Sequence, residues 1–272
     1  MIWKIAKEMT DICHRMDPTR PVVFVTDRPD QYTASGAIQV TDVPALTYRL
    51  PRYGFMHEHS PIGLVLGGET ASTFSSRGCY HFPDEVIVNA EHPDGQSSSY
   101  DLEHGSWSNL PDDDWAMQDD KPWTIGEFVW TGFDYLGEPT PYDEYWPSRS
   151  SYFGIFDLAG IPKDRYWLYR SHWRTDSHTL HLVPHWTFPG REGQVTPVYC
   201  YTDFDEAELF VNGKSQGRRR KDPKTRLDRY RLRWNDVVYQ PGELKVVAYG
   251  ADGRPAMTEV VRTAGRPAKV AL

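Results

Sequence analysis

The chain has 272 residues, enough for one large domain or two ordinary ones. Lys and Arg number 30 against 38 Asp and Glu, and the formal net charge is -8. An acidic chain repels nucleic acid and anionic membrane surfaces on average, so neither is expected as a partner. No apolar segment approaches the length that spans a bilayer.

Aromatic residues make up 14% of the chain, with 10 Trp and 16 Tyr. Such rings stack on the faces of sugars. They are also common in β-strands, and composition alone favours this second interpretation. The three cysteines, Cys13, Cys79 and Cys200, are odd in number and far apart, which indicates neither a disulfide framework nor a CxxC metal site. We predict no cofactor and assign no metal ligands, and whether a metal participates stays open.

The first part of the chain has the pattern of a parallel β/α protein. Apolar residues recur at helical spacing in residues 2–16, which predicts an amphipathic helix. Residues 22–25 are continuously β-branched or aromatic, as in a strand buried on both faces. Further strands are expected at residues 43–50, 62–67 and 123–130. Residues 77–120 are expected to form a long irregular segment.

The pattern changes beyond residue 173 to short alternating segments, which predict an all-β sandwich of immunoglobulin-like size. Strands are expected at residues 195–202, 207–211, 231–234, 244–249 and 258–263. Asn212-Gly213 predicts a hairpin and Asp252-Gly253 another turn. The boundary falls near residues 175–190. The basic residues 218–221 are interpreted as a solvated turn rather than a nucleic-acid patch.

Glu69 is the first candidate for catalysis. It follows an apolar segment and Gly67-Gly68, so it is expected at the carboxyl end of a buried strand. Catalytic groups gather at that face of β/α barrels. The double glycine would allow a tight turn and the close approach of a ligand. A loop or N-cap carboxylate fits the same pattern about equally well.

Three other residues are candidates for contacts with a ligand. Tyr48, at the end of the preceding strand, could hydrogen-bond such a carboxylate, or it could be a core tyrosine. Trp130, at the end of the last strand, could form the floor of a sugar site or belong to the core. Glu127 lies inside that strand, where a carboxylate must be paired. It could anchor a ligand hydroxyl, and a structural salt bridge is at least as compatible with its position.

Several other kinds of chemistry are disfavoured. His57 and His59 lack a third partner at metal-ligand spacing. The motifs of zincins, P-loop NTPases, dinucleotide-binding domains and serine hydrolases are all absent from the sequence.

Six segments of the chain carry a family resemblance: residues 67–73 (Gly-Gly-Glu-Thr-Ala-Ser-Thr), 126–142, 147–154, 162–165, 208–215 and 241–245. In this order they resemble glycoside hydrolase family 2, in its bacterial β-galactosidase-like branch. The resemblance covers essentially the whole chain. It implies that residues 1–176 are the second half of a catalytic (β/α)₈ TIM barrel, that residues 177–260 are an immunoglobulin-like β-sandwich, and that residues 261–272 begin a further segment or tail.

The resemblance also implies roles for individual residues. Glu69 matches the nucleophile of a retaining glycosidase, Tyr48 a tyrosine that contacts the nucleophile, and Trp130 a tryptophan of the sugar pocket. The general acid/base of this family lies in a Gly-Asn-Glu motif on barrel strand four, just before a helix. That motif is absent from these residues. The chain is therefore expected to begin just after its catalytic acid and to hydrolyse poorly by itself.

Two functions of different classes follow. The first is a retaining hydrolase of terminal β-D-galactosides, acting on a β-galactoside or an oligosaccharide. The second is a non-catalytic carbohydrate-binding or complementing fragment that assembles with a chain carrying the first half-barrel. Association with that half or with a second copy is open, and so is the bacterial compartment, cytoplasmic or periplasmic.

Overall fold

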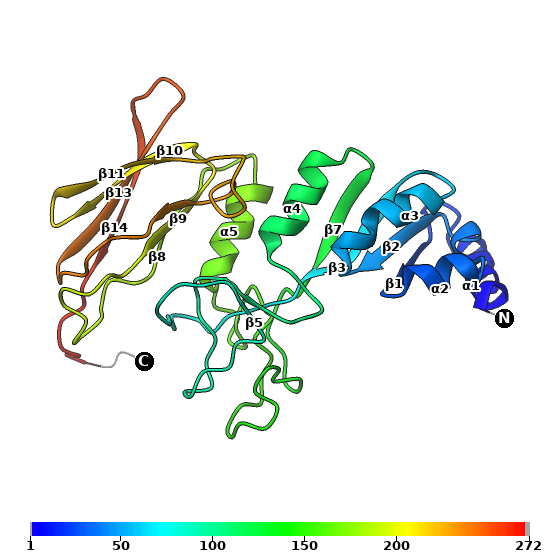
Figure 1. Ribbon diagram of the computed structural model, residues 1–272, viewed down its shortest axis with the longest axis horizontal. Helices are drawn as coiled ribbons and strands as arrows, with labels where there is room; N and C mark the ends of the chain where they lie inside the picture. The colour runs from blue at the N-terminus through cyan, green and yellow to red at the C-terminus, as the bar shows by residue number, and fades with distance from the viewer. Residues whose placement is uncertain (1, 270–272) are drawn as a thin grey trace. The chain divides into compact units, whose positions relative to one another are not determined.

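A computed structural model of the chain describes residues 2–269 (Figure 1). The chain divides into two compact units, and each is described by itself. The first contains the chain up to Phe74, Ile87–Ala90 and Glu103–Gly132; the second contains Ser75–Val86, Glu91–Leu102 and the chain from Phe133 onward. No helix within residues 2–269 is both long and apolar enough to cross a membrane.

The first unit is built on a four-stranded sheet in the order β1-β2-β3-β7, and every neighbouring pair is parallel. Its strands are β1 (Val23–Thr26), β2 (Val43–Thr47), β3 (Val65–Ala71) and β7 (Thr124–Trp130). This confirms the predicted parallel β/α architecture. A small second sheet joins β4 (Thr73–Phe74), β6 (Glu103–His104) and β5 (Ile87–Val88).

Helices and 3₁₀ turns connect these strands. They are α1 (Ile2–Met16), α2 (Pro29–Ala34), η1 (Ala37–Gln39), η2 (Leu50–Arg52), α3 (Tyr53–His59) and α4 (Pro111–Asp120). The predicted helix over residues 2–16 is confirmed as α1. It buries Ala6 and Thr10, whereas Ile5 and Met9 are each 55% exposed. The core of the unit combines Ala6, Tyr32, Ile38, Leu46, Met56 and Val65.

Two expectations for the first unit were wrong. The strand at residues 22–25 is present as β1 but is not buried on both faces, since it lies at the sheet edge with Val23 and Val25 exposed by 38% and 43%. Residues 77–120 are not irregular throughout, because they contain α4. This helix has a proline in its first turn followed by three aspartates, which suit the positive end of the helix dipole.

The second unit contains two antiparallel sheets whose inner faces share one core. One sheet has the order β11-β10-β13-β14 and the other β12-β9-β8. The strands are β8 (Leu180–Val183), β9 (Val198–Thr202), β10 (Glu206–Val211), β11 (Lys214–Arg220), β12 (Leu232–Trp234), β13 (Glu243–Tyr249) and β14 (Pro255–Arg262). Trp186 and Trp234 lie in their common core. Helix α5 (Asp164–Trp173) contacts β8 and β9.

The predicted hairpin at Asn212-Gly213 is confirmed between β10 and β11. Both residues have the positive φ of a type I′ turn, 49° and 78°. The basic residues from Arg218 to Arg220 belong to the edge strand β11 and not to a turn, which corrects the earlier interpretation. Strand β8 lies inside the expected boundary region. Of the expected tail at residues 261–272, residues 270–272 are outside the described part of the chain.

Candidate active site

The candidate residues lie toward the carboxyl ends of parallel strands. Tyr48 directly follows β2, and Trp130 is the last residue of β7. Glu69 was expected just after its strand, but it lies within β3, two residues before the strand ends. The register places Thr47 beside Glu69 and Ala71 beside Trp130. The sheet therefore brings Tyr48, Glu69 and Trp130 to one edge, where β/α proteins hold their ligands.

Tyr48 and Glu69 contact each other twice. The Tyr48 hydroxyl donates a hydrogen bond to Oε2 of Glu69 at 3.0 Å, and its backbone N–H donates to the Glu69 carbonyl at 2.7 Å. Burial, and to a lesser extent the charge of Glu69, raises the pKa of Tyr48 well above its usual value. The phenol thus remains a hydrogen-bond donor to the carboxylate at neutral pH, as the sequence analysis expected.

Two further side chains at this site were not predicted. Polar groups of Ser72 and Trp107 lie near the Tyr48 hydroxyl and partly oppose the rise in its pKa. The loop that carries Trp107 is fixed to the end of β3, because Ser108 Oγ donates to the Ser72 carbonyl at 3.2 Å. Only the high aromatic content pointed to Trp107, since the surrounding loop has no periodic pattern.

The glycines before Glu69 serve packing within the sheet rather than a tight turn. A Cβ atom on Gly68 would lie 2.3 Å from Val25 Cγ1, and one on Gly67 would lie 2.7 Å from Thr70 Cγ2. Both distances are far below van der Waals contact. Only glycine therefore fits at these two positions, and the pair fixes the approach of β3 to its neighbours.

Glu127 faces helix α4. Trp115 Nε1 donates to its Oε1 at 2.7 Å. Asp114 lies near by and accepts from the Ala71 N–H at 2.9 Å. Burial raises the pKa of Glu127, and burial together with the charge of Glu127 raises the pKa of Asp114 well above its usual value. These contacts favour the structural interpretation of Glu127, with a bond to Trp115 in place of a salt bridge.

We expect Glu127→Gln to make the chain more stable at neutral pH. A carboxyl group whose pKa is raised by folding contributes stability that is complete below its unfolded pKa. That stability is lost as the pH rises through the folded value. Glutamine cannot ionise and still accepts from Trp115. The unfolding temperature of the variant should therefore exceed that of the original chain increasingly as the pH rises above the usual glutamate pKa of 4.5.

Glu58→Gln is the matched control, because Glu58 is an exposed glutamate of the same unit. It should leave the pH dependence of the unfolding temperature unchanged. A loss of stability in Glu127→Gln at neutral pH would instead mean that the ionised carboxylate stabilises the fold.

Trp130 and His57 were also singled out in the sequence, and the structure shows the surroundings of each. Trp130 is half-buried, and its place in a sugar pocket stays a prediction. His57 stacks on Trp123 at 4.4 Å between ring centroids, and its Nδ1 is 2.8 Å from the Gly63 carbonyl oxygen. His57 is thus held by packing and a backbone contact.

Known proteins resemble this chain along nearly all of its length. β-Galactosidase BoGH2A of Bacteroides ovatus is 38% identical over 98% of this chain and 31% of its own length. A β-glucuronidase of Bacteroides fragilis is 23% identical over 94% of this chain and 35% of its own. The crystal structure of a β-glycosidase from Bacteroides vulgatus superposes with a TM-score of 0.78 at 30% identity, covering 97% of this chain and 35% of that one. Residues 193–257 match a domain of unknown function, DUF4982.

The proteins that share this parallel β/α unit with its strand-end carboxylate are named as glycosidases. More narrowly, the relatives and solved structures that the chain resembles are β-galactosidases, β-glucuronidases and other members of glycoside hydrolase family 2. The chain spans about a third of the length of the relatives that it matches.

Proposed function

We propose that the chain carries the nucleophile half of a retaining β-galactosidase, with Glu69 as the nucleophile. The observation that supports this most directly is the Glu69 carboxylate, positioned on β3 and hydrogen-bonded by Tyr48 at 3.0 Å. A carboxylate held in this way has one fixed oxygen and a defined direction of attack, which a nucleophilic displacement requires.

In the proposed reaction, a Glu69 oxygen attacks the anomeric carbon as the bond to the leaving oxygen breaks, and a covalent glycosyl ester forms. Water then attacks the same carbon, releases the sugar and frees the carboxylate. Tyr48 orients Glu69 in both steps. Trp130 and Trp107 supply aromatic faces near the strand ends, on which a sugar ring can stack.

The reaction needs a second carboxyl group that protonates the leaving oxygen and later takes a proton from water. Glu127 is a poor candidate, since Trp115 and burial under α4 engage it. The Gly-Asn-Glu motif that carries this group in the family is absent from these 272 residues. We propose that the acid/base is supplied from outside these residues, in a longer polypeptide or by a partner chain.

A β-galactoside is the favoured substrate. The relative named as a β-galactosidase is 38% identical over 98% of this chain, whereas two named as β-glucuronidases are 38% identical over 57% of it and 23% identical over 94% of it. A β-glucuronide is the second candidate, because solved β-glucuronidase structures also share this fold.

The test is hydrolysis of nitrophenyl β-D-galactoside and nitrophenyl β-D-glucuronide. The chain is assayed alone and together with a first half-barrel that carries Gly-Asn-Glu, either as a second polypeptide or fused ahead of residue 1. We expect the chain alone to be slower by about 10²–10⁴-fold or more, the usual contribution of general acid–base catalysis. The complemented protein should prefer the galactoside.

The outcomes separate the parts of the proposal. Turnover that survives Glu69→Gln would rule out Glu69 as the nucleophile. A preference for the glucuronide would overturn the substrate and leave the nucleophile standing. If the complemented protein binds galactose but hydrolyses neither glycoside, the chain is a carbohydrate-binding module.

A further inference from the structure

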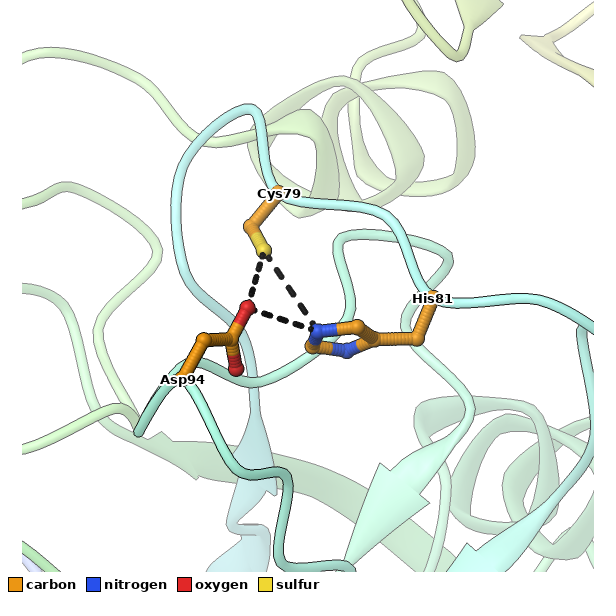
Figure 2. A group of neighbouring side chains, drawn as sticks. All are labelled: Cys79, His81 and Asp94. Atoms are coloured by element: carbon orange, nitrogen blue, oxygen red, sulfur yellow. Dashed lines mark hydrogen bonds and ion pairs between the residues drawn. The ribbon is translucent and has the colours of Figure 1, made fainter. Parts of the chain in front are cut away.

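Three side chains of the second unit converge on one point (Figure 2). They are Cys79 and His81 from one segment and Asp94 from another. Cys79 Sγ lies 3.8 Å from His81 Nε2 and 3.9 Å from Asp94 Oδ2, and the Nε2–Oδ2 distance is 3.1 Å. A thiol, an imidazole nitrogen and a carboxylate oxygen thus form a small triangle.

The dimensions of this triangle fit a metal ion. Protein atoms bound to one tetrahedral zinc at about 2.0–2.3 Å lie roughly 3.3–3.6 Å from one another. The three atoms differ from that arrangement by only a few tenths of an ångström. We propose that Cys79, His81 and Asp94 bind a divalent transition-metal ion, with Zn²⁺ the best fit. This site is independent of the proposed glycosidase reaction.

The identity of the ligands selects the ion. Thiolate and imidazole favour Zn²⁺ over Mg²⁺ and Ca²⁺, which prefer oxygen. Ionised Cys79 and Asp94 would together balance the charge of the ion. The two segments are already joined, because the Ser99 N–H donates to the Cys79 carbonyl at 2.7 Å. The site is therefore largely formed before the ion binds.

A catalytic thiol relay is a poorer explanation of the same cluster. In a Cys-His-Asp relay, the thiol contacts one imidazole nitrogen and the carboxylate orients the ring through the other. Here both Cys79 and Asp94 contact Nε2 of His81. The His81 ring stacks on His92 at 3.6 Å between centroids, which holds Nε2 toward the other two ligands.

The arrangement leaves the fourth position of a tetrahedral ion for water or another ligand. Asp94 also lines a cavity of about 620 Å³, together with Arg77, Tyr145 and Asp157. The ion would join residues 79–81 to residue 94 and so stiffen a wall of this cavity. We therefore expect zinc to raise the unfolding temperature of the chain by several degrees.

The test uses the full 272-residue chain after treatment with a chelator. Zinc chloride is added, and bound zinc is measured by equilibrium dialysis with elemental analysis. Co²⁺ serves as a second probe, because a cobalt–thiolate bond gives a charge-transfer absorption band. The variants are Cys79→Ser and Asp94→Asn. The matched control is Cys13→Ser, which removes an exposed thiol of α1.

We expect one zinc per chain, and the cobalt–thiolate band, in the original chain and in Cys13→Ser. Cys79→Ser should abolish the band and weaken zinc binding at least tenfold, and Asp94→Asn should also weaken it at least tenfold. Far-ultraviolet circular dichroism establishes that each variant is folded. Equal zinc binding by the original chain and folded Cys79→Ser would overturn the proposal, as would no binding by the original chain.

Discussion

Replacing Glu69 with glycine should abolish hydrolysis by the complemented enzyme and, with sodium azide present, lead it to produce α-galactosyl azide. The loss should be on the order of 10³-fold or more, because a covalent nucleophile acts as a unit with its acid partner. Azide can enter the space left by the carboxylate and attack the anomeric carbon from the same face. One displacement inverts that carbon, so a β-galactoside yields an α-product.

The stereochemistry of the azide product, measured by proton NMR, decides the role of Glu69. A β-azide would mean that Glu69 is the acid/base, since azide would then trap the covalent intermediate from the opposite face. Tyr48→Phe is a second variant, for which we expect a smaller loss of activity. It removes the phenol hydroxyl, and with it the hydrogen bond to Glu69, and should lower kcat/KM by about 10–100-fold, the usual value of a hydrogen bond to a charged group. No change in that variant would show that Tyr48 does not orient the nucleophile.

Asp101→Asn should destabilise the second unit by about 3–5 kcal/mol, because it removes the carboxylate that pairs with a buried cation. Asp101 Oδ1 lies 2.7 Å from Arg165 Nη2, and the two side chains are 0% and 2% exposed. Asparagine keeps the shape and tolerates the positive φ of this position, 63°. Lys163 is close by, and burial followed by the charge of Arg165 lowers its pKa to about 8.

Urea unfolding of Asp101→Asn, Arg165→Met and the double variant measures this effect. Each single variant removes one charge of the ion pair, whereas the double variant removes both. We therefore expect the double variant to recover much of the loss of the singles. Additive losses in the double variant would show that the ion pair itself is not the source of the effect.

The sequence predicted the elements whose apolar pattern is local and strong. Helix α1, strand β7 and the Asn212-Gly213 hairpin all follow from spacing or from turn chemistry that needs no distant partner. Tyr48 and Glu69 were paired correctly because adjacent parallel strands end at the same edge. The final strand, β14, covers Pro255–Arg262, whereas the sequence predicted it at residues 258–263. Residues 261–262, expected in the tail, belong to this strand.

What the sequence could not provide depends on contacts between distant segments. Val23 is exposed because β1 lies at the edge of its sheet. The order of strands in a sheet cannot be predicted from the local apolar pattern. Helix α4 has almost no apolar periodicity, and its position is fixed by Asp114 and Trp115 reaching the sheet. The Cys79–His81–Asp94 cluster was missed for the same reason, since Asp94 joins it only through folding.

The two units differ in how their sheet edges resist unwanted pairing. In the second unit, edge strand β11 carries Arg218, Arg219 and Arg220, and like charges there repel an approaching copy of the same strand. In the first unit, edge strand β1 offers the apolar residues Val23 and Val25 to solvent and has no charged residue between Val23 and Thr26. Fibre or aggregate growth should therefore start from β1. A single lysine at position 23 or 25 would place a charge on this edge strand and so oppose aggregation of the chain at high concentration.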